Sequence, residues 1–208
     1  MFALSIEGSE LKIKITADDD IGRLLSLVNR GLHDPDQSPF STPWNQIDLP
    51  HRNYEFAKKI WLHRAQLHPR DWYLDFTVFY KDQIVGMQSV FAKDFPVARS
   101  FMTSSWLGRD FQNRGIGTTT RRAILFLMFE LFKAEEGHSE AYEDNIASIK
   151  VCEKLGYRAN GFRSWGRNEK PAKSLQFVIT RQDYARNSIS GFISSGTESA
   201  MKFLELYS

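Results

Sequence analysis

The sequence predicts an α/β protein of the α+β type, with a mixed, largely antiparallel sheet of six or seven strands and flanking helices. Strand-like runs follow one another in the middle of the chain, helical patterns precede them, and strands and helices alternate after them. The 208 residues suit one well-packed domain. We expect that domain at 1–186, followed by an arm at 187–208 that is helical or makes a dimer contact.

Composition and charge narrow the class of protein. Hydrophobic residues make up 42% and charged residues 25% of the chain, which is ordinary for a soluble globular protein. A net charge of +2 gives no reason to expect nucleic acid. The single cysteine, Cys152, excludes an intramolecular disulfide and a cysteine-based zinc site. The N-terminus lacks signal-peptide character, and the apolar run 123–129 is too short to cross a membrane. We therefore expect a cytoplasmic protein without a metal.

The N-terminal part reads as a strand followed by two helices. Residues 11–16 alternate between apolar and polar side chains, as a half-buried strand does. Acidic residues at 18–20 then begin a helix that ends near Gly31. A long polar segment with four prolines follows at 33–50, and a segment of this length is more often functional than idle. The second helix, at 54–67, is ended by Pro69.

The remaining elements form a meander and then a strand–helix alternation. Three strands are predicted at 72–80, 83–92 and 98–107, with Lys81 and Asp82 as a hairpin turn. A helix at 118–133 follows, then a short strand at 138–143. A second helix at 145–155 is closed by Gly156, and two strands at 157–165 and 174–180 complete the sheet.

A glycine turn at 112–117 lies between a strand and a helix, an arrangement that can hold phosphate. Glycines allow the backbone to approach an anion, and the first N–H groups of the helix point toward it. Arg114 within the turn is well placed to meet a pyrophosphate. Arg109, Arg121 and Arg122 add positive charge nearby, and we expect the last two to reach an additional phosphate.

Two common phosphate-binding motifs do not fit this turn. A P-loop needs Lys and then Ser or Thr after its second glycine, whereas the sequence reads Ile116-Gly117-Thr118. A dinucleotide fingerprint needs a third glycine where Thr120 stands, early in a parallel unit rather than behind a meander. The pattern that remains is Gln/Arg-x-x-Gly-x-Gly, met by Gln112, Gly115 and Gly117.

The turn and two further segments resemble a known family. The lead-in at 105–108 reads Ser-Trp-Leu-Gly, and Asn145-x-x-Ser148 is followed at 154–157 by Lys-Leu-Gly-Tyr. Over residues 9–184 the chain resembles the GNAT-superfamily N-acyltransferases, in the subgroup of ribosomal-protein N-terminal acetyltransferases. The stretches 33–44 and 93–96 also resemble an actinobacterial branch that includes succinyl-transferring members.

The resemblance implies the GNAT fold, in which acyl-CoA lies in a gap where the fourth and fifth strands splay apart. It implies that the main chain at 105–107 pairs with the pantetheine arm and that N–H groups at 113–118 hold the pyrophosphate. A backbone N–H at Ser105 would polarise the acyl carbonyl as its oxyanion develops. The implied residues for binding the acyl-CoA cosubstrate are Trp106, Leu107, Gln112, Asn113, Arg114, Gly115, Ile116, Gly117, Thr118 and Asn145.

Cys152 is the candidate proton donor. It stands seven residues after Asn145, so the two share a helix face at a separation of about 10 Å. The resemblance implies a tyrosine or serine at this position to reprotonate the departing thiolate. A thiol with an ordinary pKa of about 8.5 can donate a proton there. The alternative is a small buried residue of the core.

The general base and the acceptor site are left open. The strand at 100–105 contains no acid. The candidates for the base are therefore a water on Thr103 or Ser104, the side chain of His138, or an acid such as Asp34 or Asp36 in the loop at 33–44, called the early loop below. The loop at 33–44 is expected to face the acceptor, because it joins the two helices that wall the acceptor site in the family. Its alternative is a rigid surface loop. The acceptor-binding candidates are His33, Asp34, Asp36, Phe40 and Trp44.

The leading functional hypothesis is direct transfer of an acyl group from acyl-CoA to a primary amine in a ternary complex. The acyl group is acetyl or succinyl, and succinyl would call for a cation such as Arg99 or Arg163. Alternatives are a non-catalytic acyl-CoA-binding module and a dinucleotide-binding enzyme. The partners expected are acyl-CoA, an amine such as a protein N-terminus or small molecule, and a second copy in a homodimer, with no nucleic acid or membrane.

Overall fold

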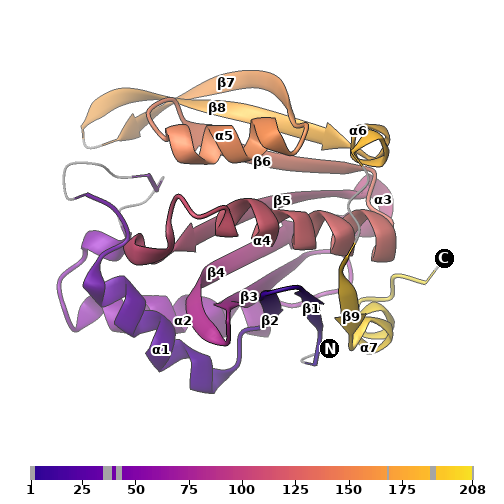
Figure 1. Cartoon of the computed structure of the whole chain (residues 1–208), viewed down its shortest axis with the longest axis horizontal. Coiled ribbons are helices and arrows are strands. Elements are labelled where there is room, and N and C mark those ends of the chain that lie inside the picture. Colours follow the sequence, from indigo (N-terminus) through magenta and orange to yellow (C-terminus); the bar gives the residue numbers. More distant parts are fainter. Residues whose placement is uncertain (1–2, 35–38, 41–43, 168, 188–190, 208) are drawn as a thin grey trace.

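The computed structural model describes residues 3–34, 39–40, 44–167, 169–187 and 191–207. Within them nine strands form one sheet in the order β7-β8-β6-β5-β4-β3-β2-β1-β9, and the first four of this order lie one below another in the upper half of Figure 1. The strands are β1 (Ser5–Gly8), β2 (Leu11–Ile15), β3 (Trp72–Tyr80), β4 (Gln83–Ala92), β5 (Ser100–Leu107), β6 (Glu136–Tyr142), β7 (Arg158–Arg167), β8 (Lys170–Thr180) and β9 (Ile193–Ser195).

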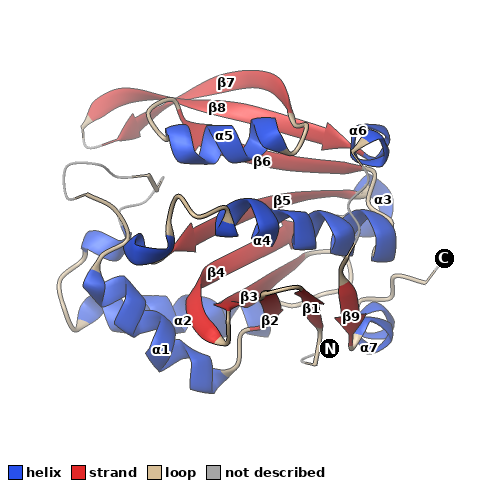
Figure 2. Ribbon diagram, in the orientation of Figure 1, coloured by secondary structure: helices blue, strands red, loops and turns tan. Residues whose placement is uncertain are grey.

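Seven α-helices accompany the sheet in the described part of the chain (Figure 2). They are α1 (Asp18–Arg30), α2 (His51–Ala65), α3 (Phe95–Ala98), α4 (Ile116–Leu125), α5 (Ile146–Lys154), α6 (Arg181–Arg186) and α7 (Thr197–Phe203). A π-helical turn, Phe126–Leu131, lengthens α4, and 3-10 turns lie at Trp44–Gln46 and Arg109–Phe111. No helix among these residues is both long and apolar enough to cross a membrane. The same residues hold no group of three or more His, Cys, Asp or Glu that could bind a metal.

The predicted meander is confirmed. Strands β2, β3, β4 and β5 pair antiparallel in sequence order, and only β5 and β6 are parallel neighbours among the described strands. Lys81 and Asp82 turn the β3–β4 hairpin with φ of 48° and 60°. Positive φ at both positions matches the twist of the strands that they join. The result is a mixed, largely antiparallel sheet of the GNAT type with flanking helices.

Two hydrophobic cores lie on opposite faces of the sheet. Alternate residues of β3 such as Leu74 and Phe76, together with Phe101 of β5, pack under α4 and its π-helical extension. Residues of the opposite parity, including Met87 of β4, pack under α1 and α2. A strand residue therefore tells which layer it faces, so Ser105 points to the α4 side and Trp106 to the α1–α2 side.

The sheet has nine strands in the described residues, against the six or seven predicted. β1 pairs with β2 and, on its other edge, with β9, and both additional strands are short. The β1 region does carry a short alternation, with Leu4 and Ile6 buried, which sequence reasoning missed. β9 has only three residues, so periodicity gives no signal for it. The segment expected as an arm thus contributes β9 and α7, and Ala200 and Leu204 of this segment are fully buried. A dimer contact there stays a prediction.

Helix α6 was also missed by sequence reasoning, although its start carries a recognisable signal. The Thr180 hydroxyl accepts from the Asp183 backbone N–H at 3.2 Å, and Asp183 Oδ2 accepts from the Thr180 N–H at 3.2 Å. This reciprocal cap resembles the Ser/Thr-x-x-Glu box with a shorter acid. Thr-x-x-Asp after a predicted strand is the signal that could have found the helix.

Candidate functional site

The parallel strands β5 and β6 separate after three residue pairs. Ser100 pairs with Glu136, Phe101 with Gly137 and Met102 with His138, and the pairing ends there. β5 continues to Leu107 beside β4, while β6 continues to Tyr142 beside β8. The inner edge of β5 from residue 103 onward therefore presents unpaired backbone groups to the opening. This is the splay predicted between the fourth and fifth strands.

The glycine turn closes one end of this opening. β5 ends at Leu107, the chain makes the 3-10 turn, and Gly115 caps α4 with φ of 79° and ψ of −8°. Residues 113–115 are exposed, and Asn113 also has a positive φ of 59°. The first N–H groups of α4 point outward at the positive end of the helix dipole. The turn thus has the conformation that an anion-binding site requires.

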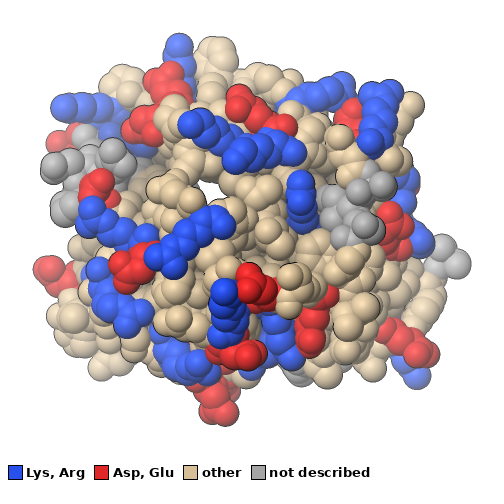
Figure 3. Space-filling view, in the orientation of Figure 1, with Lys and Arg blue, Asp and Glu red and all other residues tan. Residues whose placement is uncertain are grey.

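Positive charge borders a hollow on this face of the molecule. In Figure 3 the surface is hollowed between the regions of α4 and α5, and Lys and Arg side chains lie along its rim. Arg114 is exposed, with its guanidinium 6.0 Å from the centre of the Phe111 ring. Arg122 is exposed, but Arg121 is buried at 4% exposure. The expectation that Arg121 reaches a phosphate is therefore wrong, because its side chain turns into the protein.

Gln112 connects the glycine turn to the early loop. Its side-chain nitrogen donates to the Leu32 carbonyl at 2.6 Å and to the Leu107 carbonyl at 3.0 Å. Both contacts are to backbone oxygens, so the side chain holds the end of β5 against the segment that follows α1. The signature glutamine therefore shapes the site through its side-chain nitrogen.

The early loop brings several of the predicted acceptor residues together. His33 lies 5.8 Å from Phe40 between ring centres, and Phe40 lies 5.4 Å from Trp44. The Trp44 ring stacks on Phe56 of α2 at 5.7 Å and lies 6.2 Å from Trp106 of β5. These rings form a continuous aromatic row from the loop to the strand that lines the splay.

The two acidic candidates of the loop have different outcomes. Asp34 forms an ion pair with Arg109, which precedes the glycine turn. Its carboxylate is therefore engaged in joining the loop to the turn, in parallel with Gln112. Asp36 lies outside the described residues, and so does the stretch 41–43.

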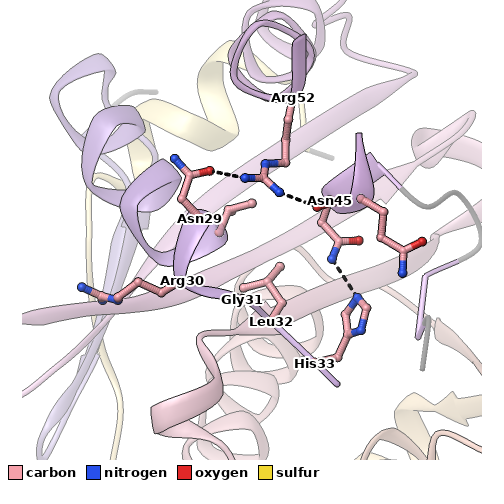
Figure 4. A pocket seen from close by; sticks show the side chains of 9 residues that line it. Asn29, Arg30, Gly31, Leu32, His33, Asn45 and Arg52 are labelled. Carbon is pink, nitrogen blue, oxygen red and sulfur yellow. Dashed lines mark hydrogen bonds between the residues drawn. The ribbon is translucent and has the colours of Figure 1, made fainter. Parts of the chain in front are cut away.

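A cavity of about 530 Å³ lies where the loop meets α1 and α2. Figure 4 shows Arg52 donating to Asn29 Oδ1 and to the Asn45 carbonyl, both at 2.9 Å. The Asn45 amide nitrogen lies 2.7 Å from His33 Nε2. The lining is cationic and polar, and includes Val28, Asn29, Arg30, Gly31, Leu32, His33, Asn45, Gln46 and Arg52.

Helix α5 forms the far wall of the splay. Asn145 caps it, accepting from the Ser148 N–H at 3.1 Å, which explains why an Asn stands three residues before a Ser. Cys152 on the same helix is 1% exposed. Burial raises the pKa of the Cys152 thiol, and the positive charge of Arg121 opposes that shift. Cys152 is therefore a neutral thiol in the core beside the splay.

Two hydroxyls and a guanidinium join the strands at the splay. Arg121 of α4 donates to Ser105 Oγ at 3.3 Å and to Ser139 Oγ at 3.1 Å. Ser105 belongs to the unpaired part of β5 and Ser139 to β6. Sequence reasoning missed Ser139. Its position one residue after His138, with alternation along β6, is the signal that could have placed it on the α4 side.

A buried polar network on the α1–α2 face was missed as well. His63 of α2 lies with Nδ1 2.7 Å from Asp75 Oδ2, and Ser89 Oγ donates to Asp75 Oδ1 at 2.6 Å. Ser89 pairs across the sheet with Ser104, which faces the splay on the same side. An acid in the middle of the apolar run 72–80 was the available signal, since a buried carboxylate needs partners.

The remaining candidates lie at the closed end of the splay. His138 is partly exposed, and its Nε2 lies 3.5 Å from Glu136 Oε2. It lines a cavity of about 240 Å³ together with Met102 and Arg163. Arg99 lies with its guanidinium 5.6 Å from the centre of the Phe95 ring. Of the two cations considered for an acidic acyl group, Arg163 is the one in a cavity beside the splay.

A splayed parallel pair, a glycine turn at a helix N-terminus and a helix on the far wall define a coenzyme A-dependent acyltransferase as the class of protein. Comparison with known families agrees. The profile of the acetyltransferase (GNAT) domain matches residues 13–158. The chain belongs to the GNAT acetyltransferase family.

Individual relatives are distant in sequence and close in fold. A probable spermine N(1)-acetyltransferase of Bacillus subtilis subsp. natto (strain BEST195) is 24% identical over 89 residues, which are 40% of this chain. The chain spans 59% of the length of that protein. A solved probable acetyltransferase is 18% identical with a TM-score of 0.68, covering 86% of this chain and 98% of its own. RimL, a ribosomal L7/L12 alpha-N-protein acetyltransferase solved with coenzyme A, is 16% identical with a TM-score of 0.69, covering 85% and 97%.

Proposed function

We propose that the protein transfers an acyl group from acyl-CoA directly to a primary amine. The splay carries this proposal: the inner edge of β5 is without a strand partner from residue 103 up to the Leu107 carbonyl, which accepts from Gln112, and the strand leads into the Gly115-capped helix. A pantetheine arm fits along such an edge as an added strand, with its pyrophosphate at the N–H groups of α4. Membership of the GNAT family supports the same assignment.

The residues of the chain would act mainly by positioning and polarisation. Backbone N–H groups at 113–118 would hold the pyrophosphate, and the amide of Asn145 would contact the arm from the far wall. A backbone N–H of β5 near Ser105 would polarise the acyl carbonyl. The described part of β5 contains no acid, so the amine would lose its proton to a water or to a group of the α1–α2 face.

Initial-rate kinetics test the proposal. The purified protein is given acetyl-CoA or succinyl-CoA and a panel of amines, and released thiol and acylated product are measured. Transfer within a ternary complex predicts intersecting reciprocal plots, and the rate is expected to rise between pH 6 and pH 9 as the amine loses its proton. A flat pH profile in a chemistry-limited assay contradicts direct attack. Binding of acyl-CoA without transfer to any amine would instead identify a non-catalytic binding module.

For the acceptor, we infer an amine that carries neutral or anionic groups, such as a protein N-terminus, rather than a polycation. The 530 Å³ cavity beside the early loop is lined by Arg30, Arg52 and His33, and none of its described lining residues is acidic. Such a lining repels a polyamine and suits peptide carbonyls or a carboxylate. Comparing a short peptide with spermine under the same conditions tests this, and a preference for spermine refutes it.

Two further expectations concern the state of the protein. We infer a homodimer, supported by exposed apolar side chains on α7 and the tail, where Phe203 and Tyr207 are 50% and 57% exposed. Sedimentation analysis of the wild type and of a Phe203→Ser variant checks it, and a monomeric wild type refutes it. We also infer a cytoplasmic location, since a single cysteine fits a reducing compartment. Fractionation of cells that express the tagged protein checks the location.

A further inference from the structure

Arg121 is a buried cation that lacks an acidic partner. Its side chain is 4% exposed, and a guanidinium stays charged at every pH of interest. Its two terminal nitrogens donate to Ser105 and Ser139, while its Nε–H has no acceptor. Across the residues that the structure describes, no carboxylate lies within ion-pair distance of it. A buried charge left in this state is costly, which indicates that an anion completes the site when the protein works.

The position of Arg121 shows which part of the ligand would meet it. Ser105 and Ser139 lie on the two strands just beyond their last backbone pair, so the guanidinium spans the beginning of the splay. Arg121 belongs to the second turn of α4, whereas the phosphate site is at the exposed glycine turn. The interior end of the splay is where the reactive end of a bound acyl-CoA would lie. The anion that acyl transfer would produce at that end is the thiolate of coenzyme A, whereas its phosphates would lie at the glycine turn.

The titratable groups around Arg121 support this location. Cys152 and Tyr157 come from α5 and from the residue that leads into β7. Burial raises the pKa of each, and the charge of Arg121 lowers the pKa of each. The negative charge of Glu153, on the exposed side of α5, raises the pKa of Cys152 slightly and so opposes the effect of Arg121. The field of Arg121 therefore already acts on a thiol at this position.

We propose that Arg121, with the hydroxyls of Ser105 and Ser139, binds the sulfur of coenzyme A as a thiolate. Arg121 would thus stabilise the leaving group by charge, in place of a proton donor. The proposal rests on the proposed acyl transfer, and concerns how the same site handles the departing sulfur.

The transfer step balances without a further reactant. The neutral amine nitrogen attacks the thioester carbonyl, a C–N bond forms and the C–S bond breaks. The sulfur leaves with the bonding electron pair as a thiolate that Arg121 holds. The nitrogen gives its proton to water or a base, and the thiolate takes up a proton from solvent when the free coenzyme leaves.

Direct measurement of the bound thiol tests the proposal without relying on turnover. Coenzyme A and desulfo-coenzyme A differ only in the thiol, so the difference between the spectra of their complexes reports the thiolate of the ligand as pH is raised. An opposite charge nearby lowers a pKa by about 1–3 units. We expect the pKa of the bound thiol to lie at least one unit below that of free coenzyme A. At a pH above the pKa of the free thiol, each unit by which this pKa falls should tighten binding of coenzyme A about tenfold relative to desulfo-coenzyme A.

Three variants assign the effect to Arg121. Arg121→Gln should return the bound thiol to the pKa of free coenzyme A, and Arg121→Lys should keep part of the shift. Arg122→Gln, on the exposed side of the same turn, should keep the full shift even if it weakens binding of the phosphates. Because both ligands share every other contact, general damage to the site changes their affinities equally.

The outcomes separate the possibilities. If Arg121→Gln does not fold, the wild type alone decides, since an unshifted thiol in its complex overturns the proposal. A second outcome also overturns the proposal: the pKa of the bound thiol is unshifted, and the wild type prefers succinyl-CoA over acetyl-CoA while Arg121→Gln does not. That outcome would assign the guanidinium to the carboxylate of the acyl group. Failure of the wild type to bind either coenzyme refutes the proposed function itself, which is a different result.

Discussion

Replacing Gly115 with alanine should destabilise the protein without any steric clash. Gly115 has φ of 79°, a region in which an L-residue is strained. An added Cβ would meet no heavy atom within 4 Å, so the whole cost comes from the backbone. That cost is about 1–2 kcal/mol for one residue in the left-handed region. Chemical denaturation followed by fluorescence should show this loss in the free energy of unfolding.

The same change should weaken binding of coenzyme A. If the left-handed turn is the conformation that holds the pyrophosphate, the Gly115→Ala substitution reduces the population of that conformation by the strain energy. The strain of about 1–2 kcal/mol is shared between the two measurements, because a turn that relaxes out of the left-handed conformation restores stability but has to be strained again on binding. If the turn relaxes completely, coenzyme A binding should weaken by roughly 5- to 30-fold and the loss of unfolding free energy should be correspondingly small. Titration calorimetry with coenzyme A measures this directly and does not depend on knowing the acceptor.

Two other glycines provide matched controls. Gly161, in the β7 bulge, has φ of 89° and open space around its Cβ position, so Gly161→Ala should cost similar stability and leave coenzyme A binding unchanged. Gly22 lies within α1 with open space and no positive φ, so Gly22→Ala should stabilise by about 0.5–1 kcal/mol. Wild-type affinity in Gly115→Ala together with a stability loss well below about 1 kcal/mol would refute the turn as the phosphate site, because the relaxed turn would then bind coenzyme A as well as the left-handed turn does.

Three further changes test other parts of the structure. Asp75→Ala leaves the His63 imidazole and the Ser89 hydroxyl without the acceptor that they share and should cost about 1–3 kcal/mol in urea unfolding. Hydrogen bonds from Thr180 lower the pKa of Asp183, so the carboxylate stabilises the folded protein at neutral pH. That stabilisation should be lost as pH falls below about 3.8 and through the pKa of the folded state. Asp183→Asn should flatten this acid dependence when the free energy of unfolding is measured from about pH 7 to about pH 2. Cys152→Ala should lose less than about tenfold in turnover, whereas loss of a general acid would cost about 100-fold or more.

Local sequence signals predicted the elements that depend on local physics. The alternation at 11–16, the hairpin at Lys81 and Asp82, and the helix end at Gly156 all follow from residues within a few positions of each other. The same holds for the helix at 145–155, because Asn145 supplies its own cap.

Features that depend on distant partners were not predictable. β9 forms because 193–195 meets β1 across nearly the whole chain, whereas β1 also forms a local hairpin with β2. The pairing of Asp34 with Arg109 joins residues 75 positions apart, and no pattern in the sequence announces it. Arg121 was assigned to phosphates because helical spacing gives a direction only when the face toward the core is known. Thr120 and Arg121 are both buried, which apolar periodicity does not reveal.

The contacts of the early loop join it to the glycine turn and to β5. Gln112 donates to a carbonyl of the loop and to the last carbonyl of β5, and Arg109 binds Asp34 from the same turn. The aromatic row ends on Trp106 of β5, so the loop and the strand share a second set of contacts. The cavity beside the early loop is therefore attached to the glycine turn and to β5. Gln112 orders the early loop as well as the end of β5, so its role in the motif is wider than that of a phosphate cradle.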